Sequence, residues 1–529
     1  MQGVVVPTTQ HRPTPLPLDK VARDSEKHDR AIVIVGGGVS GIWTALTLKE
    51  LGYTNITILE REMRVGGKAA SFEYAGLRYP LGAVGTPLAL EKASFTESQL
   101  FEKPLRFGAS LLGKTGRNLQ VLNANHLVVD SKGWPGPFPQ SELTSRVPAD
   151  DWQRAFGSAG EPERFYPHMH DFRAGSSDLA DDTLLPKIVP RWGQPETSWP
   201  LVYVSAHGYG VARAQDAPPY YYWARFAQKS TNAGAKGPLG MALPGHAPLG
   251  PRGPALRGWA STQLFEEKLQ RAGVHVRTGA SVTSIVRTTE HVRVQTADGH
   301  VREYDQLVLA SDLKGSLKYL DADASERALF EKIRHQPYYT VASFISLPWL
   351  ATGSVYYLSE HQGGLTARRG GSLGTQMAGE AADAGRATAG CPTILLKANK
   401  GSNLTISWAY GGEGVGPPQM EQCLRETVLR LGGRFGGVSF IKPWPDYFPH
   451  VPAAELRANF HKRLDALQGQ RRMFMVGEVF NLPLVSECVD WARFLIRRSF
   501  AAGAGATASD AERQRRVLGR VGRRAVLNK

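Results

Sequence analysis

A glycine-rich segment near the amino terminus carries residues arranged to bind phosphate. Gly36, Gly38 and Gly41 follow directly after the apolar run 31–35, and Ser40 lies between the last two glycines. The first glycine permits a tight turn, the second lets a pyrophosphate approach the backbone, and the third allows a helix and a strand to pack closely. The amino terminus of the following helix offers free N–H groups and a positive dipole end to the phosphates.

An acidic residue completes this pattern. Glu60 ends the next apolar run, 56–59, about twenty residues past the glycines, where a carboxylate accepts hydrogen bonds from an adenosine ribose. A glutamate at this place also repels a 2′-phosphate, which disfavours NADP. Strand, glycines, helix, second strand and acid together predict a dinucleotide-binding βαβ unit. A glycine-rich turn that binds nothing is the alternative, and it leaves Glu60 unexplained.

Hydrophobic periodicity places the elements that must hold these residues. It predicts a helix from Ile42 that ends at Gly52, and a later α/β stretch between Ser261 and Asp312. The further elements that we expect are a helix over 263–271, strands over 275–277, 281–288, 292–296, 306–310 and 473–476, and a helix over 486–501. The glycines of 411–416 follow an apolar run but lack the third spacing and a later acid, so we expect a loop there, not a second nucleotide site.

The segment after Glu60 resembles the flavin-containing amine oxidase superfamily, in which a Glu-Arg-x-x-x-x-Gly-Gly-basic extension continues around FAD. Here it reads Glu60-Arg61, then Gly66-Gly67-Lys68. Gly82-Ala83-Val84 resembles the segment beside the isoalloxazine ring. Val282 matches the position whose backbone holds the adenine, the acid of Gly477-Glu478 matches the one that binds the ribityl chain, and the helix start at Val485 would face the flavin. The resemblance therefore implies FAD binding by Gly36, Gly38, Ser40, Gly41, Glu60, Arg61, Gly66, Gly67, Lys68, Gly82, Ala83, Val84, Val282, Gly477, Glu478 and Val485.

This resemblance implies an α/β fold, with a Rossmann-type FAD-binding domain and an inserted mixed-sheet substrate domain. We expect a flexible lead over 1–29 and a basic tail over 503–529. The FAD-binding domain would be discontinuous, and the predicted ranges are 30–92, 250–312 and 440–502 for this domain and 93–249 and 313–439 for the substrate domain.

Five short segments resemble the branch that contains the polyunsaturated fatty acid double-bond isomerases, namely 207–210, 331–338, 447–451, 468–471 and 476–478. The branch implies that a hydride leaves an allylic carbon for flavin N5 and returns at another carbon, so the flavin carries the chemistry and the catalytic protein residues stay unassigned. The substrate would be an apolar or anionic lipid-like molecule. Candidate contacts are Tyr209, Tyr447 and Phe448, for which packing in a core is the alternative.

Other roles stay open at this point. Arg106 and Arg117 are weakly matched candidates for an arginine beside a substrate carboxylate, and a solvated surface position is the alternative for each. His450 could donate a proton, although a structural histidine is the simpler interpretation. The competing functions are an FAD-dependent oxidase or dehydrogenase of an amine or a C–C bond with O₂ as acceptor, and a non-catalytic flavin-binding partner protein.

The three cysteines are widely separated and odd in number, so we expect no disulfide framework, no metal site and a reducing compartment. The Ser-Gly-Gly-Cys-Tyr segment used for covalent flavin attachment in the superfamily is absent, since Cys488 lies in Ser-Glu-Cys-Val. Non-covalent FAD is therefore predicted.

The 529 residues carry a formal net charge of +15 and are 42% hydrophobic, enough for two or more lobes. The basic tail is expected to be solvated, with weak membrane-surface contact as the alternative. It lacks interleaved aromatics, so no nucleic acid is expected as a partner. The sequence shows no signal peptide and no membrane-spanning run, which predicts a cytoplasmic protein of undetermined oligomeric state.

Overall fold

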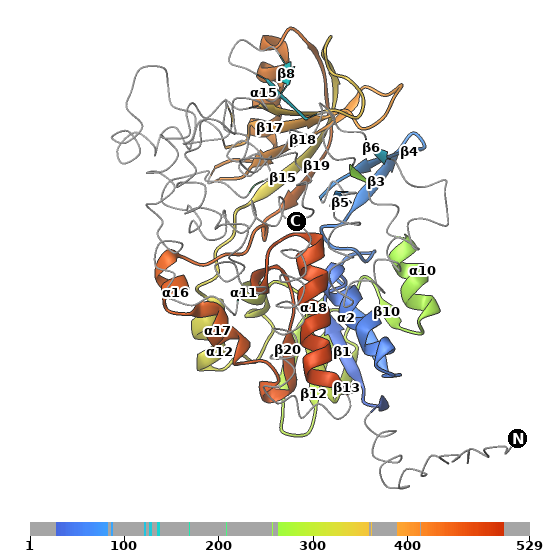
Figure 1. The fold of residues 1–529 in the computed structure, drawn as a ribbon, viewed down its shortest axis with the longest axis vertical. Helices are drawn as coiled ribbons and strands as arrows, with labels where there is room; N and C mark the ends of the chain where they lie inside the picture. Colours follow the sequence, from blue (N-terminus) through green and yellow to red (C-terminus); the bar gives the residue numbers. More distant parts are fainter. Residues whose placement is uncertain are drawn as a thin grey trace, which may run out of the picture.

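Short β-branched strands form a parallel sheet at the centre of the lower lobe (Figure 1). A computed structural model of the chain describes residues 28–82, 86–87, 121–122, 126–129, 135–137, 169, 208, 256–257, 263–358, 361, 389–412 and 414–501. The five strands lie in the order β10-β2-β1-β14-β20, and every neighbouring pair is parallel. Their bounds are β1 Ile32–Val35, β2 Ile56–Leu59, β10 His275–Arg277, β14 Gln306–Leu309 and β20 Met473–Met475.

The strands β1 and β2 are buried at every position, as expected for a parallel sheet covered on both faces. Helix α2 (Val39–Glu50) packs beside α18 (Val485–Phe500) in this lobe (Figure 1). Because parallel strands end on the same side, the residues after β1, β2, β14 and β20 meet along one edge, which we call the carboxyl edge. Ligands in open α/β sheets bind outside this edge.

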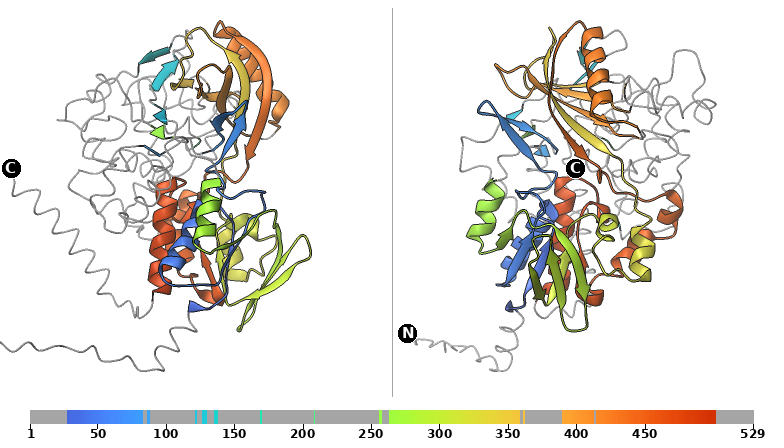
Figure 2. Two further views of the ribbon diagram at one scale, coloured as in Figure 1. Left: turned by 90° about the vertical axis from the view of Figure 1, so that its right-hand side faces the viewer. Right: turned by 180° about the vertical axis from the view of Figure 1, so that it is seen from behind.

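Smaller elements complete the lower lobe. A three-stranded antiparallel meander packs against the parallel sheet, and short helices lie at its flank (Figure 2). These elements are β11 Val282–Arg287, β12 Val292–Thr296, β13 Val301–Tyr304, α10 Gln263–Arg271, α11 Leu313–Ser316, α12 Ala324–Phe330, α16 Ala453–Arg457, α17 Phe460–Asp465 and the 3₁₀ turns η8 Gln470–Arg472 and η9 Glu478–Phe480.

A mixed seven-stranded sheet forms the upper lobe, in the order β19-β15-β18-β17-β16-β7-β8. Helix α15 (Pro417–Arg430) packs Leu424 and Val428 against one face of it. The strands are β19 Arg434–Trp444, β15 Tyr338–Ser346, β18 Leu404–Tyr410, β17 Pro392–Leu396, β16 Val355–Leu358, β7 His126–Val129 and β8 Pro135–Pro137. The remaining strands are β3 Ser71–Tyr74, β4 Leu77–Pro80, β5 Thr86–Pro87, β6 Val121–Leu122 and β9 Leu256–Arg257. The predicted α/β fold class, a Rossmann-type domain with a mixed-sheet second lobe, is confirmed.

In the described part of the chain, two of the passages between the two cores lie side by side. Ile333 still belongs to the lower core and Tyr338 to the upper one, while Trp444 packs above and Phe448 below. The chain therefore crosses from one core to the other near residues 336 and 446, whereas the predicted domain boundaries lie at 312 and 440. The other domain boundaries stay a prediction. The passing segments 333–338 and 444–450 lie antiparallel, with Arg334 and His450 exchanging two backbone hydrogen bonds of 2.8 and 3.0 Å. We call this pair of segments the crossover ribbon.

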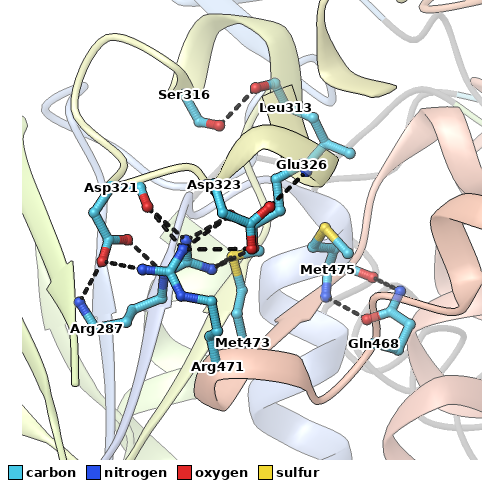
Figure 3. A network of polar contacts seen from close by, with 10 residues as sticks. All are labelled: Arg287, Leu313, Ser316, Asp321, Asp323, Glu326, Gln468, Arg471, Met473 and Met475. Carbon is cyan, nitrogen blue, oxygen red and sulfur yellow. Dashed lines mark hydrogen bonds and ion pairs between the residues drawn. The ribbon is translucent and has the colours of Figure 1, made fainter. Parts of the chain in front are cut away.

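A buried ion-pair network fixes the loop that leads into β20 (Figure 3). The Arg287 guanidinium is fully buried and lies 2.6 Å from a carboxylate oxygen of Asp321 and 2.6 Å from one of Glu326. Arg471 adds a second guanidinium, 2.8 Å from Asp321, and adopts a left-handed backbone with φ +46°. These contacts join β11, α12 and β20.

A disulfide joins Cys391, just before β17, to Cys423 in α15, with 5.2 Å between the Cα atoms. The prediction that the cysteines form no disulfide is therefore wrong, because the glycine loop and the helix start fold residue 423 back onto the beginning of β17. The expected loop between β18 and α15 is present. In the described part of the chain, no helix has both the length and the apolar content needed to cross a membrane.

Candidate cofactor site

The first glycines form the turn that the sequence predicts. Gly36 has φ +111°, and a Cβ atom there would lie 2.7 Å from the Ala310 carbonyl oxygen at the end of β14. A Cβ atom at Gly41 would collide with the Gly36 carbonyl oxygen. Both glycines are therefore required by the close approach of β1, α2 and β14.

Gly38 faces open space instead, since a Cβ atom there would meet nothing nearer than the Gly67 Cα atom at 3.9 Å. The second glycine loop pairs with the first here, because Gly66 N–H donates to the Gly37 carbonyl at 2.8 Å. Gly38 caps α2 without a side-chain hydrogen bond, so the first N–H groups of the helix point outward. An open backbone beside free helix N–H groups offers the donors that a pyrophosphate needs.

The Glu60 carboxylate is buried at the end of β2. It accepts hydrogen bonds from the backbone N–H groups of Gly37 at 2.6 Å and Glu62 at 2.9 Å. Ala280 N–H donates to the Glu60 carbonyl, so the segment leading to Val282 lies against the same strand end. The acid and the start of β11 therefore lie together beside the glycine turn, and their contacts with a ribose and an adenine stay predictions.

A charged cluster lies at the other end of the carboxyl edge. Lys68 Nζ is 3.0 Å from a carboxylate oxygen of Glu478 and donates to the Asp446 carbonyl at 3.0 Å. Burial alone would lower the pKa of Lys68, but the neighbouring carboxylates outweigh it and raise that pKa above its ordinary value. Burial has the opposite effect on the acid: it raises the pKa of Glu478, and the Lys68 ammonium offsets only part of this rise. Lys68 thus joins the second glycine loop to both 446 and 478.

The backbone before Glu478 also borders open space. Gly477 has φ +140°, a conformation open to glycine, and a Cβ atom there would find nothing within 4 Å. Helix α18 begins at Val485, one residue before the predicted start. Two glycine loops with open backbone, a buried acid and a helix start on one edge fit a flavin dinucleotide.

Several predicted residues lie elsewhere or outside the described residues. The latter are Ala83, Val84, Tyr209, Arg106 and Arg117. The Arg61 side chain is 70% exposed and lies 3.8 Å from Glu62, so its cofactor role stays a prediction. Ser40 is buried in the first turn of α2. A Cβ atom at Gly82 would collide with the Lys68 carbonyl oxygen, so Gly82 itself packs directly on Lys68.

The predicted substrate residues are placed differently from one another. Tyr447 stacks on Tyr338, with ring centroids 5.1 Å apart, and the Lys68 ammonium lies 5.9 Å from its ring centroid. Phe448 is 1% exposed in the lower core, which favours the packing alternative. His450 is buried as well; burial lowers its pKa to about 4 and its Nδ1 lies 2.8 Å from the Phe448 carbonyl, as for a structural histidine.

Sequence reasoning missed three side chains near this edge. Arg64 lies between Glu60 and Gly66, and its Nη1 is buried without a hydrogen-bond partner among the described residues, so it could hold an anion. Asp312, just after β14, and His335, on the crossover ribbon, form a pair with 2.8 Å between Oδ1 and Nε2. An acid after the fourth parallel strand was the available signal for Asp312.

Two segments match known families. Residues 34–86 match the family described as NAD(P)-binding Rossmann-like domain, and residues 253–346 match the family described as flavin containing amine oxidoreductase. The predicted resemblance to the flavin-containing amine oxidase superfamily is confirmed. Both matches carry segments of the carboxyl edge, and they indicate a flavin as the cofactor and an oxidoreductase-type enzyme.

Solved structures show the same fold over nearly the whole chain. A CLA-producing fatty acid isomerase from P. acnes superposes with a TM-score of 0.66 at 20% identity, covering 89% of this chain and 99% of that one. A putrescine oxidase variant gives 0.58 at 12% identity, covering 89% and 99%. A putative protoporphyrinogen oxidase from Exiguobacterium sp. 255-15 gives 0.52 at 17% identity, covering 89% and 98%.

A curated relative matches a short part of the chain. This relative, one of the subunits of the ferredoxin:CoB-CoM heterodisulfide reductase of Methanosarcina mazei, is 45% identical over 53 residues. The match covers 10% of this chain and 7% of that protein.

Proposed function

We propose that this chain is an FAD-dependent enzyme that shifts double bonds in an unsaturated fatty acid or a similar lipid. The observation that carries the flavin part is the convergence of two open glycine loops, Glu60 and Gly477 at one carboxyl edge. The isomerase part is supported by the short motifs shared with fatty acid isomerases and by a fold like that of the P. acnes enzyme.

The residues of this chain would bind the cofactor and orient it. The open backbone at Gly38 would hold the pyrophosphate, Glu60 would accept from the ribose, and Glu478 would bind the ribityl end of the cofactor. When bound, the flavin supplies reversible hydride exchange, while the protein sets geometry and electrostatics. The stacked Tyr338 and Tyr447 rings lie where this edge meets the upper sheet, and an acyl chain would pack beside the Tyr447 ring.

Non-covalent binding is part of the proposal. Cys488 is buried in α18, and burial raises the pKa of its thiol far above the ordinary value, so the nucleophilic thiolate does not form. The partner that we propose is a small apolar or anionic lipid-like molecule.

The test is incubation of the purified flavoprotein with linoleic acid, with and without oxygen, following conjugated-diene absorbance and hydrogen peroxide. We expect diene formation at equal rates in both atmospheres and no peroxide. Peroxide without diene would replace the isomerase with an oxidase. If neither conjugated diene nor peroxide forms, linoleate is not the substrate.

An oxidase of amines is the second candidate, and one feature of the site favours it. Three carboxylates, those of Glu478, Asp446 and Asp312, act electrostatically on Lys68. An excess of negative charge near the cofactor attracts an ammonium group more readily than a carboxylate. Release of peroxide with a diamine, and none with linoleate, would establish this candidate.

A further inference from the structure

The carboxyl edge holds the crossover ribbon at two points. Lys68 contacts one segment of the ribbon, donating to the Asp446 carbonyl and lying under the Tyr447 ring. His335 holds the other segment, since its Nε2 lies 2.8 Å from Asp312 Oδ1. Lys68 and Asp312 both follow parallel strands, so the same edge that carries the proposed cofactor site also holds the link to the upper lobe.

Asp312 is itself rigidly placed. Its second carboxylate oxygen accepts the Gly315 N–H at 2.6 Å and caps α11, while a Cβ atom at Gly36 would lie 3.1 Å from the Ser311 nitrogen. Although burial opposes it, the bond from His335 and the cap hold the pKa of Asp312 below its ordinary value. The carboxylate accepts, so Nε2 of His335 is the nitrogen that donates.

Through the crossover ribbon, the position of His335 also fixes the position of the Tyr338–Tyr447 stack. Gln336 N–H donates to the Tyr447 carbonyl at 2.8 Å, one residue from His335. Tyr338 and Tyr447 then stack across the ribbon, with their rings 21° from parallel. A Cβ atom at Gly208 would lie 2.7 Å from the Tyr447 ring, so little space remains for the stack to move.

We propose that Asp312 and His335 are positioning residues, which hold the crossover ribbon and its Tyr338–Tyr447 stack in place beside the cofactor. The inference rests on the proposed function, because it assigns both residues to the same site. Their effect is indirect, through the ribbon, so a change in them alters the surroundings of the flavin ring without removing a cofactor contact.

The test compares holoprotein with His335 unchanged, His335→Ala and His335→Gln. A glutamine places its amide nitrogen near the position of histidine Nε2 and can donate to Asp312, whereas alanine cannot. The matched control is His291→Ala, which removes another histidine–carboxylate pair, 3.2 Å from Glu303, on the meander away from the carboxyl edge. The readouts are the visible circular dichroism of the bound flavin and steady-state kinetics.

For His335→Ala we expect unchanged flavin content, an altered visible spectrum and a kcat lowered about 10- to 100-fold, the scale of a displacement near 1 Å. His335→Gln should restore both readouts, and His291→Ala should change neither. A flavin spectrum of His335→Ala like that of the control would overturn the inference, as would a glutamine variant that behaves like alanine. If linoleate is inert even with the unchanged protein, the proposed substrate fails while the spectra still decide the role of His335.

Discussion

At the scale of single residues, Glu60 is the residue that we propose to connect the fold to the cofactor. Its carboxylate accepts two backbone hydrogen bonds and still lies at the strand end where a ribose would bind. We predict that Glu60→Gln weakens FAD binding by about 1.5–3 kcal/mol, the range for a hydrogen bond to a charged group. The measurement is titration of apoprotein with FAD by fluorescence quenching.

The control for this variant is Glu62→Gln, two residues away. The Glu62 side chain is 47% exposed and pairs loosely with Arg61 at 3.8 Å, so its loss should leave FAD affinity within experimental error. Equal affinities for all three proteins would refute the ribose role of Glu60.

His450 makes stability depend on pH. Its pKa is about 4 in the folded chain because of burial, below the ordinary 6.5, so between these values the unfolded chain binds the extra proton. The stabilisation is complete above about pH 6.5 and is lost as pH falls toward 4, with about 3 kcal/mol as its upper size.

The corresponding experiment is urea unfolding at pH 7.5 and pH 5 for the unchanged protein, His450→Gln and the exposed control His300→Gln. We expect the loss of stability between the two pH values to shrink in His450→Gln and to persist in the control. An equal loss in all three proteins would show that other groups cause it.

At the scale of elements, the network of Arg287 ties β11 to α12 and to the loop before β20 (Figure 3). We predict that Arg287→Ala destabilises the chain by about 3–5 kcal/mol, because it removes the nearer guanidinium from buried Glu326 and leaves only Arg471, at 3.3 Å, to pair with it. Arg277→Ala is the control, since its ion pair with Asp298 is partly exposed and should cost below about 1 kcal/mol. Similar melting temperatures for the two variants would contradict the prediction.

The disulfide between Cys391 and Cys423 can be tested by counting free thiols. Chain denatured without reductant should show one free thiol, that of Cys488, and three after reduction. Cys423→Ser should lower stability by about 3–4 kcal/mol, from loop entropy at a separation of 32 residues. Three thiols before reduction would mean that the bond does not form.

The strands were predictable because their apolar runs are short and bounded by glycine or acid. The structure confirms helix 263–271 and strand 275–277 at the predicted residues, and places the last helix one residue earlier at both ends. The Cys391–Cys423 bond was not predictable, since it depends on how α15 folds back over the upper sheet. The pair of Asp312 and His335 escaped for the same reason, because it joins two elements whose approach only the fold determines.

At the scale of the whole molecule, local patterns indicated two lobes but not where the chain changes lobe. Residues 313–333 pack in the lower core, although the sequence assigned them to the substrate domain, which was predicted to begin at residue 313. The reason is packing: α11 and α12 bury Leu313 and Phe330 there. Hydrophobic periodicity predicts that a helix has a buried face, but it does not predict in which of the two cores that face is buried.

The cofactor site that we propose draws on chain segments near residues 38, 60, 280, 312 and 478, so ligand binding should stabilise the whole lower lobe. We predict that FAD at about 100 times its Kd adds about 2.7 kcal/mol of stability to the apoprotein, seen as a higher melting temperature. Riboflavin, which lacks the pyrophosphate and adenosine, should add far less, because the open backbone at Gly38 and Glu60 then have no ligand groups. Equal shifts with FAD and riboflavin would mean that the glycine turn does not bind the dinucleotide, and the absence of any shift with FAD would remove the flavin assignment itself.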